Sequence, residues 1–131
     1  MKTTSVFVYA LVCVGVIAGF SGCSQPVTIF DEALLIGKWQ RPVTASDGTP
    51  GYDCYRYDAD GNGVTWDTSD DVSEAEGQPF AWTLNGATLT LLHQGEMGQT
   101  VPKVYTLTLL TTSSLAYKDD YAKSYAFTKV N

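Results

Sequence analysis

The sequence predicts an all-β protein built from about eight short antiparallel strands, and two observations carry this prediction. From Leu35 onward, apolar and polar residues mostly alternate with a period of two, which is typical of half-buried strands. Turn-forming sequences interrupt the alternation at intervals of roughly 8–12 residues, the spacing of small all-β domains. Since no segment requires a crossover helix, we expect an antiparallel sandwich or barrel rather than a parallel α/β fold.

Alternation and turn signals together set the expected limits of each strand. The first strand places Leu35, Gly37 and Trp39 on one face, and Pro42 is expected to end it. Asn-Gly pairs follow the second and the fourth strand and indicate tight hairpins, because this dipeptide suits positive φ. The strands are therefore expected at residues 35–41, 52–58, 63–68, 78–84, 87–92, 101–110, 114–118 and 122–130.

The N-terminal residues have the character of a targeting segment. Lys2 precedes the apolar run 6–20, which is shorter than the about 20 residues that a membrane span needs. The run ends in Phe20-Ser21-Gly22-Cys23, which resembles the lipobox of a bacterial lipoprotein signal. This resemblance implies cleavage before Cys23 and acyl chains on that residue; the alternative is an ordinary secretory peptide in which Cys23 is incidental.

The expected division of the chain follows from that cleavage. Residues 1–22 are the signal peptide, residues 23–33 a lipid-anchored tether that ends in a short helical turn, and residues 34–131 one domain. More than one acyl chain on Cys23 anchors a protein firmly. The implied location is the cell envelope, at the outer membrane. The periplasmic face is favoured because no acidic run follows Cys23.

Charge and cysteine content exclude several classes of function. Without Lys2, seven basic residues oppose fourteen acidic ones, and an acidic protein repels nucleic acid. Cys13 leaves with the signal and Cys23 carries lipid, so Cys54 has no disulfide partner and is expected to be a small, partly buried side chain. His93 is the only histidine, and we expect it at the surface of a strand end. No enzyme activity and no cofactor are therefore predicted.

A family resemblance covers the predicted domain. Gly37-Lys38-Trp39 at the start of the first strand resembles the G-x-W signature of lipocalins, and the whole pattern resembles the small lipocalin-like lipoproteins of Bacteroidetes-type bacteria. It implies one closed, up-and-down β-barrel, with Gly37 and Trp39 closing one end. The further matching segments are Asp60-Gly61-Asn62-Gly63, Trp82-Thr83-Leu84-Asn85-Gly86, Leu89-Thr90-Leu91, Tyr105-Thr106-Leu107 and Leu115-Ala116-Tyr117.

The sequence also departs from lipocalins. They usually carry a late arginine that packs on the signature tryptophan, but no arginine follows Arg56 here. We expect Lys123 or Lys129 to cover Trp39 by a cation–π contact instead.

The barrel interior is the main candidate binding site. An eight-stranded barrel is just wide enough to be filled by its side chains or to hold one small ligand. Leu84, Leu89, Leu109 and Phe127 are also expected to point inward. The candidate ligand-binding residues are Tyr55, Tyr57, Phe80, Trp82, Leu91, Tyr105, Leu107, Tyr117 and Tyr125.

A weaker candidate is a cation site in the first hairpin. Asp58, Asp60 and Asn62 match the start of a calcium loop, but Ser69 stands where the loop needs a glutamate. A plain hairpin turn is therefore the preferred interpretation.

Two functions remain open from the sequence. The first is a monomeric lipoprotein that binds a small apolar or amphipathic ligand. The second is a protein-binding or inhibitor-type module with a solid core, which would use the loops 46–51 and 69–77. A continuous interior cavity of roughly 300 Å³ or more favours the first, and a solid interior favours the second.

Overall fold

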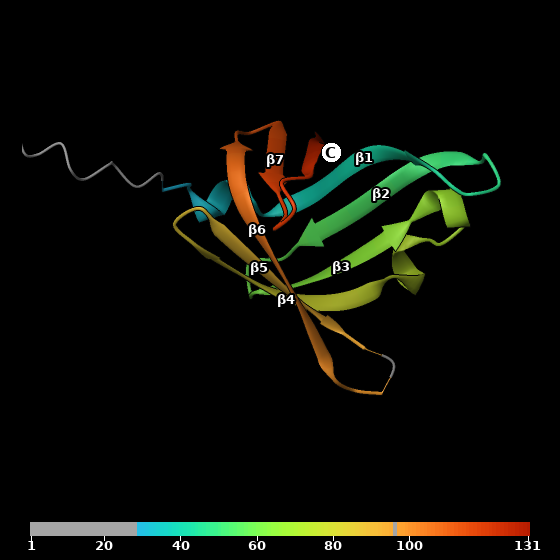
Figure 1. Cartoon of the computed structure of the whole chain (residues 1–131), viewed down its shortest axis with the longest axis horizontal. Coiled ribbons are helices and arrows are strands. Elements are labelled where there is room, and N and C mark those ends of the chain that lie inside the picture. The colour runs from blue at the N-terminus through green and yellow to red at the C-terminus, as the bar shows by residue number, and fades with distance from the viewer. Residues whose placement is uncertain (1–28, 96) are drawn as a thin grey trace, which may run out of the picture.

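The computed structural model describes residues 29–95 and 97–131, which form a closed barrel of eight antiparallel strands (Figure 1). Strand order follows chain order, and β8 returns to pair with β1. The predicted all-β, up-and-down barrel is confirmed. Cys23 and the expected signal peptide lie outside the described residues. The strands are β1 (Gly37–Thr44), β2 (Pro50–Tyr57), β3 (Asn62–Asp67), β4 (Gln78–Asn85), β5 (Thr88–Gln94), β6 (Thr100–Leu110), β7 (Ser114–Lys118) and β8 (Ser124–Val130).

A short 3-10 helix, η2 (Glu32–Leu34), precedes the barrel and covers one end of it. The Asp31 carboxylate accepts a hydrogen bond from the Ala33 backbone N–H and caps the helix. The next residue in the chain, Leu35, is fully buried. In the described part of the chain, no helix has the length and apolar character needed to span a membrane.

Trp39 fills the barrel at this closed end. Its ring is fully buried, and its Nε1 donates a hydrogen bond to the Leu35 carbonyl oxygen at 2.9 Å. Lys129 places Nζ 4.9 Å from the centroid of the Trp39 ring and donates to the carbonyl oxygens of Leu34 and Ile36. Of the two lysines considered from the sequence, Lys129 therefore covers the tryptophan.

At the C-terminal end of β6, one prediction about the core was wrong. Leu109 was expected to point inward, but its side chain is 44% exposed, whereas Leu110 is 8% exposed. A β-bulge between Leu107 and Leu109 shifts the pairing with β7 by one residue. Because side chains alternate along a strand, this single extra residue exchanges the two faces.

Pro42 does not end the first strand, contrary to the prediction. β1 continues to Thr44, and Pro42 pairs with Tyr52 of β2. On its other side, β1 pairs with β8 only as far as Gln40, so Pro42 lies on an unpaired edge. A proline is tolerated there because its missing N–H breaks no ladder bond.

The same mismatch of strand lengths occurs on β6. This strand pairs with β5 from Thr100 onward but with β7 only from Thr106 onward. The short β7–β8 hairpin therefore leaves residues 100–105 of β6 and residues 41–44 of β1 without a neighbour on one side. We call the gap between these two unpaired stretches the lateral opening.

The polar segment 69–77 packs on the barrel instead of forming a simple exposed loop. It contains the 3-10 helices η3 (Thr68–Asp70) and η4 (Glu74–Glu76). Glu74 accepts hydrogen bonds from Lys38 of β1 at 2.8 Å and from Arg56 of β2 at 2.6 Å. These pairs tie η4 to the outer face of the sheet.

Candidate functional site

The interior of the barrel has two chemically different layers. Because side chains alternate along a strand, the register identifies the inward positions. Along β1 these positions run from Trp39 to Arg41, and along β2 from Tyr57 through Tyr55 to Asp53. The apolar layer is thus at the closed end, and a charged, tyrosine-rich layer is at the opposite end.

The apolar layer is packed solid. Six of the candidate ligand-binding residues lie in it, each with 4% or less of its surface exposed: Tyr57, Phe80, Trp82, Leu91, Leu107 and Tyr117. Side chains so little exposed leave little space beside them for solvent, and of the six only Phe80 borders a hollow, a shallow one of about 150 Å³ between β4 and β5. Aromatic rings interlock here, with the centroids of Tyr57 and Phe80 5.5 Å apart. A deep ligand therefore has no room beside these six residues without a rearrangement of the core. The expected continuous interior cavity is not found in this layer, which favours the module with a solid core, and a small ligand has to bind outside the layer.

The other three candidates, Tyr55, Tyr105 and Tyr125, lie toward the open layer. Tyr105 and Tyr125 meet edge to face, with ring centroids 5.9 Å apart. The Tyr125 hydroxyl donates a hydrogen bond to Oδ2 of Asp119 at 3.1 Å. Burial raises the pKa of all three phenols, most strongly for Tyr55, so each remains a neutral donor at physiological pH.

An ion pair lies among these tyrosines. Nε and Nη2 of Arg41 both lie 3.0 Å from Oδ2 of Asp53. The guanidinium also lies over two rings, with Cζ 5.0 Å from the centroid of Tyr125 and 5.9 Å from that of Phe127. Burial raises the pKa of Asp53, and the adjacent Arg41 partly opposes that shift. Arg41 is thereby held in a fixed position on the inner wall.

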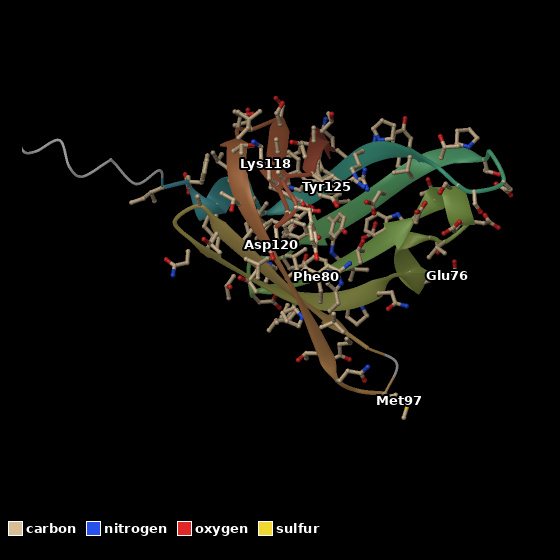
Figure 2. The ribbon with its side chains drawn as sticks, viewed as in Figure 1. Glu76, Phe80, Met97, Lys118, Asp120 and Tyr125 are labelled. Carbon is tan, nitrogen blue, oxygen red and sulfur yellow. The ribbon has the colours of Figure 1, made fainter. Side chains whose placement is uncertain are left out.

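A cavity of about 330 Å³ opens beside these residues, at the lateral opening. Figure 2 shows Tyr125 and Asp120 in this part of the molecule, while Met97 lies at the far tip of the β5–β6 hairpin. The residues that line the cavity come from the unpaired part of β6, the β7–β8 turn and β8: Pro102, Lys103, Val104, Tyr105, Asp119, Asp120, Tyr121 and Tyr125.

A larger hollow, of about 430 Å³, lies elsewhere and is a weaker candidate. It is lined by residues 42–44 of β1 and 50–52 of β2, at the β1–β2 hairpin. None of the nine interior candidates lines it. The cavity at the lateral opening is the one that combines interior tyrosines with charged groups, so we take it as the candidate site.

The sequence interpretation missed the charged residues of this site. Arg41, Asp53 and Lys103 occupy inward positions two residues beyond aromatic or apolar ones that were identified. Their charges act on one another, since both Arg41 and Lys103 influence the pKa of Asp53 from different strands. Continuing the period-two alternation to the end of each strand would have found them.

His93 is half-buried rather than a surface residue. Its ring centroid lies 5.6 Å from that of Phe80, and its Nε2 is buried without a hydrogen-bond partner in the described part of the chain. Burial, and to a smaller extent the charge of Lys103, lowers the pKa of His93. At neutral pH it is therefore an uncharged part of the wall.

In the turn between β2 and β3, where the cation site was considered, the polar groups bind one another. Arg56 forms two hydrogen bonds with the Asp58 carboxylate, and the Asn62 backbone N–H donates to Oδ1 of Asp60 at 3.0 Å. Within residues 29–95 and 97–131, no three acidic, histidine or cysteine side chains are placed to share a metal ion.

Comparisons with known proteins do not add a relative. No protein-family model, no curated protein and no solved structure matches this chain. The function of this chain is therefore inferred from the barrel and from the geometry of the lateral opening.

Proposed function

We propose that this protein is a lipid-anchored lipoprotein of the cell envelope whose barrel binds a small amphipathic ligand at the lateral opening. The observation that carries the proposal is the cavity of about 330 Å³ lined by Tyr105 and Tyr125. Its volume falls in the range of small-molecule sites, and its tyrosines offer an apolar face beside polar edges. The packed apolar layer toward the closed end provides a rigid surface next to which a ligand can bind.

The lipid anchor is supported by the sequence Phe20-Ser21-Gly22-Cys23. Metabolic labelling with an alkyne-bearing fatty acid should mark the wild type and not Cys23→Ala. Equal labelling of the two proteins would contradict the anchor.

Ligand binding can be tested with a neutral fluorescent probe, N-phenyl-1-naphthylamine. A chain that starts at Ser24 suits the experiment because all eight strands lie between Gly37 and Val130. We expect probe fluorescence to rise on binding and Tyr125→Ala to weaken binding about ten-fold, through the loss of one aromatic contact. The matched control is Tyr52→Ala, because Tyr52 is 43% exposed and does not line the cavity. Equal affinities of the two variants would place the probe elsewhere.

A second candidate function is protein binding through the β5–β6 hairpin. This hairpin extends away from the barrel (Figure 1) and exposes Leu92, Met97, Val101 and Val104, with Met97 90% exposed. Exposed apolar residues on a projecting hairpin are typical of contact surfaces. A photo-crosslinking amino acid at position 97 would then yield a discrete adduct in cells, and one at position 52 would not.

A further inference from the structure

The carboxylates near the lateral opening are mostly occupied by the protein itself. Oδ1 of Asp119 accepts hydrogen bonds from the backbone N–H groups of Tyr121 and Lys123, and Oδ2 accepts from the Tyr125 hydroxyl. Asp53 accepts a hydrogen bond from Nε of Arg41, and Nη2 of the same arginine lies 3.0 Å from the same carboxylate oxygen. Among the lining carboxylates, Asp120 alone has no hydrogen bond in the described part of the chain, and it is exposed in the β7–β8 turn.

The ammonium groups at the same opening are not occupied in this way. No carboxylate of the described residues lies within ion-pair distance of Lys103 or Lys123, and neither Nζ has a hydrogen-bond partner there. Lys103 lines the cavity at an inward position of β6, and its charge influences the pKa values of Asp53 and His93. The Nζ atom of Lys123 lies 5.2 Å from the centroid of the Tyr125 ring.

We propose that the ligand is a flat, apolar molecule that carries one anionic group, such as a carboxylate. Its apolar part lies against Tyr105 and Tyr125, and its anionic group lies between Lys103 on β6 and Lys123 beyond the β7–β8 turn. This inference rests on the proposed function and adds the charge of the ligand to it. The physical reason is that Lys103 and Lys123 bring two ammonium groups without a carboxylate partner to the opening, besides the neutral hydroxyls of its tyrosines. Asp119 and Asp53 are satisfied by hydrogen bonds within the protein, and Asp120 is the lining carboxylate that is not.

A matched series of three naphthalenes tests the proposal. The series is 2-naphthoate, 2-naphthylmethanol and 2-naphthylmethylammonium, titrated at pH 7 and low salt against the chain that starts at Ser24. We expect 2-naphthoate to bind at least about three-fold more tightly than the alcohol, as one or two exposed ion pairs allow, and the ammonium to bind most weakly. Added salt should reduce the affinity for 2-naphthoate and leave that for the alcohol nearly unchanged.

Lysine variants test whether Lys103 and Lys123 cause the preference for 2-naphthoate over the alcohol. Lys103→Met and Lys123→Met should each weaken 2-naphthoate about three-fold without changing the affinity for the alcohol. Lys118→Met is the control, because Lys118 is exposed at the end of β7 and, unlike Lys103 and Lys123, neither lines the cavity nor lies over the ring of one of its tyrosines. Equal binding of all three naphthalenes, or lysine variants that bind 2-naphthoate like the wild type, would overturn the anionic ligand and leave the binding site intact. Binding of none of the three would overturn the proposed function as well.

Discussion

Lys129 stabilises the closed end of the barrel through both its charge and its stem. The ammonium group lies over the Trp39 ring and donates hydrogen bonds to the carbonyl oxygens of Leu34, at the end of η2, and of Ile36. The stem passes over Gly37, where a Cβ atom would stand 2.6 Å from Cε of Lys129. Gly37 also has a φ of +129°, which favours glycine. The Gly37-Lys38-Trp39 motif thus leaves room for a cation that covers the tryptophan.

Lys129→Met should lower the free energy of unfolding by about 1–3 kcal/mol. The variant keeps much of the stem but loses the cation–π contact and two charge-assisted hydrogen bonds. Urea denaturation followed by tryptophan fluorescence measures the change. Lys118→Met serves as the control and should unfold within about 0.5 kcal/mol of the wild type. Identical losses in both variants would contradict the specific role of Lys129.

Cys54 is an inert thiol in this structure. Its side chain is 6% exposed, and burial, with smaller effects from Asp53, Asp67 and Glu74, raises its pKa to about 11. Since the thiolate is the reactive form, the native protein should hold very little of it at neutral pH. This placement agrees with the small, partly buried side chain expected from the sequence.

Native Cys54 should react with an aromatic disulfide reagent at pH 8 roughly 100-fold more slowly than the same thiol in the urea-unfolded chain. A rise of about two units in thiol pKa lowers the thiolate fraction by about that factor. The native rate should increase steadily as the pH approaches 11. The measurement uses the chain from Ser24, in which Cys54 is the only cysteine. Comparable native and unfolded rates would show that the thiol is neither buried nor shifted.

At the scale of elements, the β2–β3 hairpin depends on Gly63, whose lack of a side chain leaves room for its neighbours. Gly63 pairs with Tyr57 of β2 on one side and with Phe80 of β4 on the other. A Cβ atom there would overlap the Arg56 carbonyl oxygen and stand 2.5 Å from Cζ of Phe80. The prediction that Asn62-Gly63 forms the turn with positive φ was wrong: both residues belong to β3, and the positive φ of the turn is at Gly61. Gly63 is needed instead for the aromatic packing across three strands.

Gly63→Ala should therefore destabilise the protein by about 2–3 kcal/mol, the range of an overpacked core. Thermal or urea unfolding measures the loss. The neighbouring Asn62→Ala is the matched control, because Asn62 is exposed in the same strand, and it should change stability by no more than about 0.5 kcal/mol. A neutral Gly63→Ala would show that Phe80 can move aside without cost.

At the scale of the whole molecule, the barrel closes at one end and divides at the other. Three residue pairs join β1 to β8, and all of them lie near the closed end. Beyond them, Pro42 and Pro102 stand on the two strand stretches that border the lateral opening. A proline cannot donate a ladder hydrogen bond, and together with the short β7–β8 hairpin it helps to keep these edges unpaired.

Hydrogen exchange should reveal this division within a single strand. In β1, residues 38–40 have neighbours on both sides, while residues 41–44 pair only with β2. The amides of segment 41–44, to which Pro42 contributes none, should exchange at least about ten-fold faster on average than those of segment 38–40, since their ladder is more easily opened. Amide exchange followed residue by residue by NMR provides the comparison. Uniform protection along β1 would mean that the lateral opening is closed in solution.

The local patterns in the sequence were sufficient for most of the strands. The alternation of Phe80, Trp82 and Leu84 followed by Asn85-Gly86 located the β4–β5 hairpin, because a turn and its two strands are close in sequence. Leu109 was misplaced because a β-bulge depends on the partner strand and leaves no mark in the alternation. The ion pairs of Glu74 could not be predicted for a similar reason, since its cationic partners come from strands far away in the chain.

The sequence by itself therefore determined the all-β class, the strand order and the tryptophan that fills the closed end. These properties follow from local periodicity, turn chemistry and hydrophobicity, which each short segment carries. Tertiary structure alone decided where the barrel stays unpaired, that Arg41 meets Asp53 and that a cavity opens beside Tyr105 and Tyr125. Those features depend on how far each strand pairs with its neighbour, and this extent is fixed only when segments distant in the sequence come together.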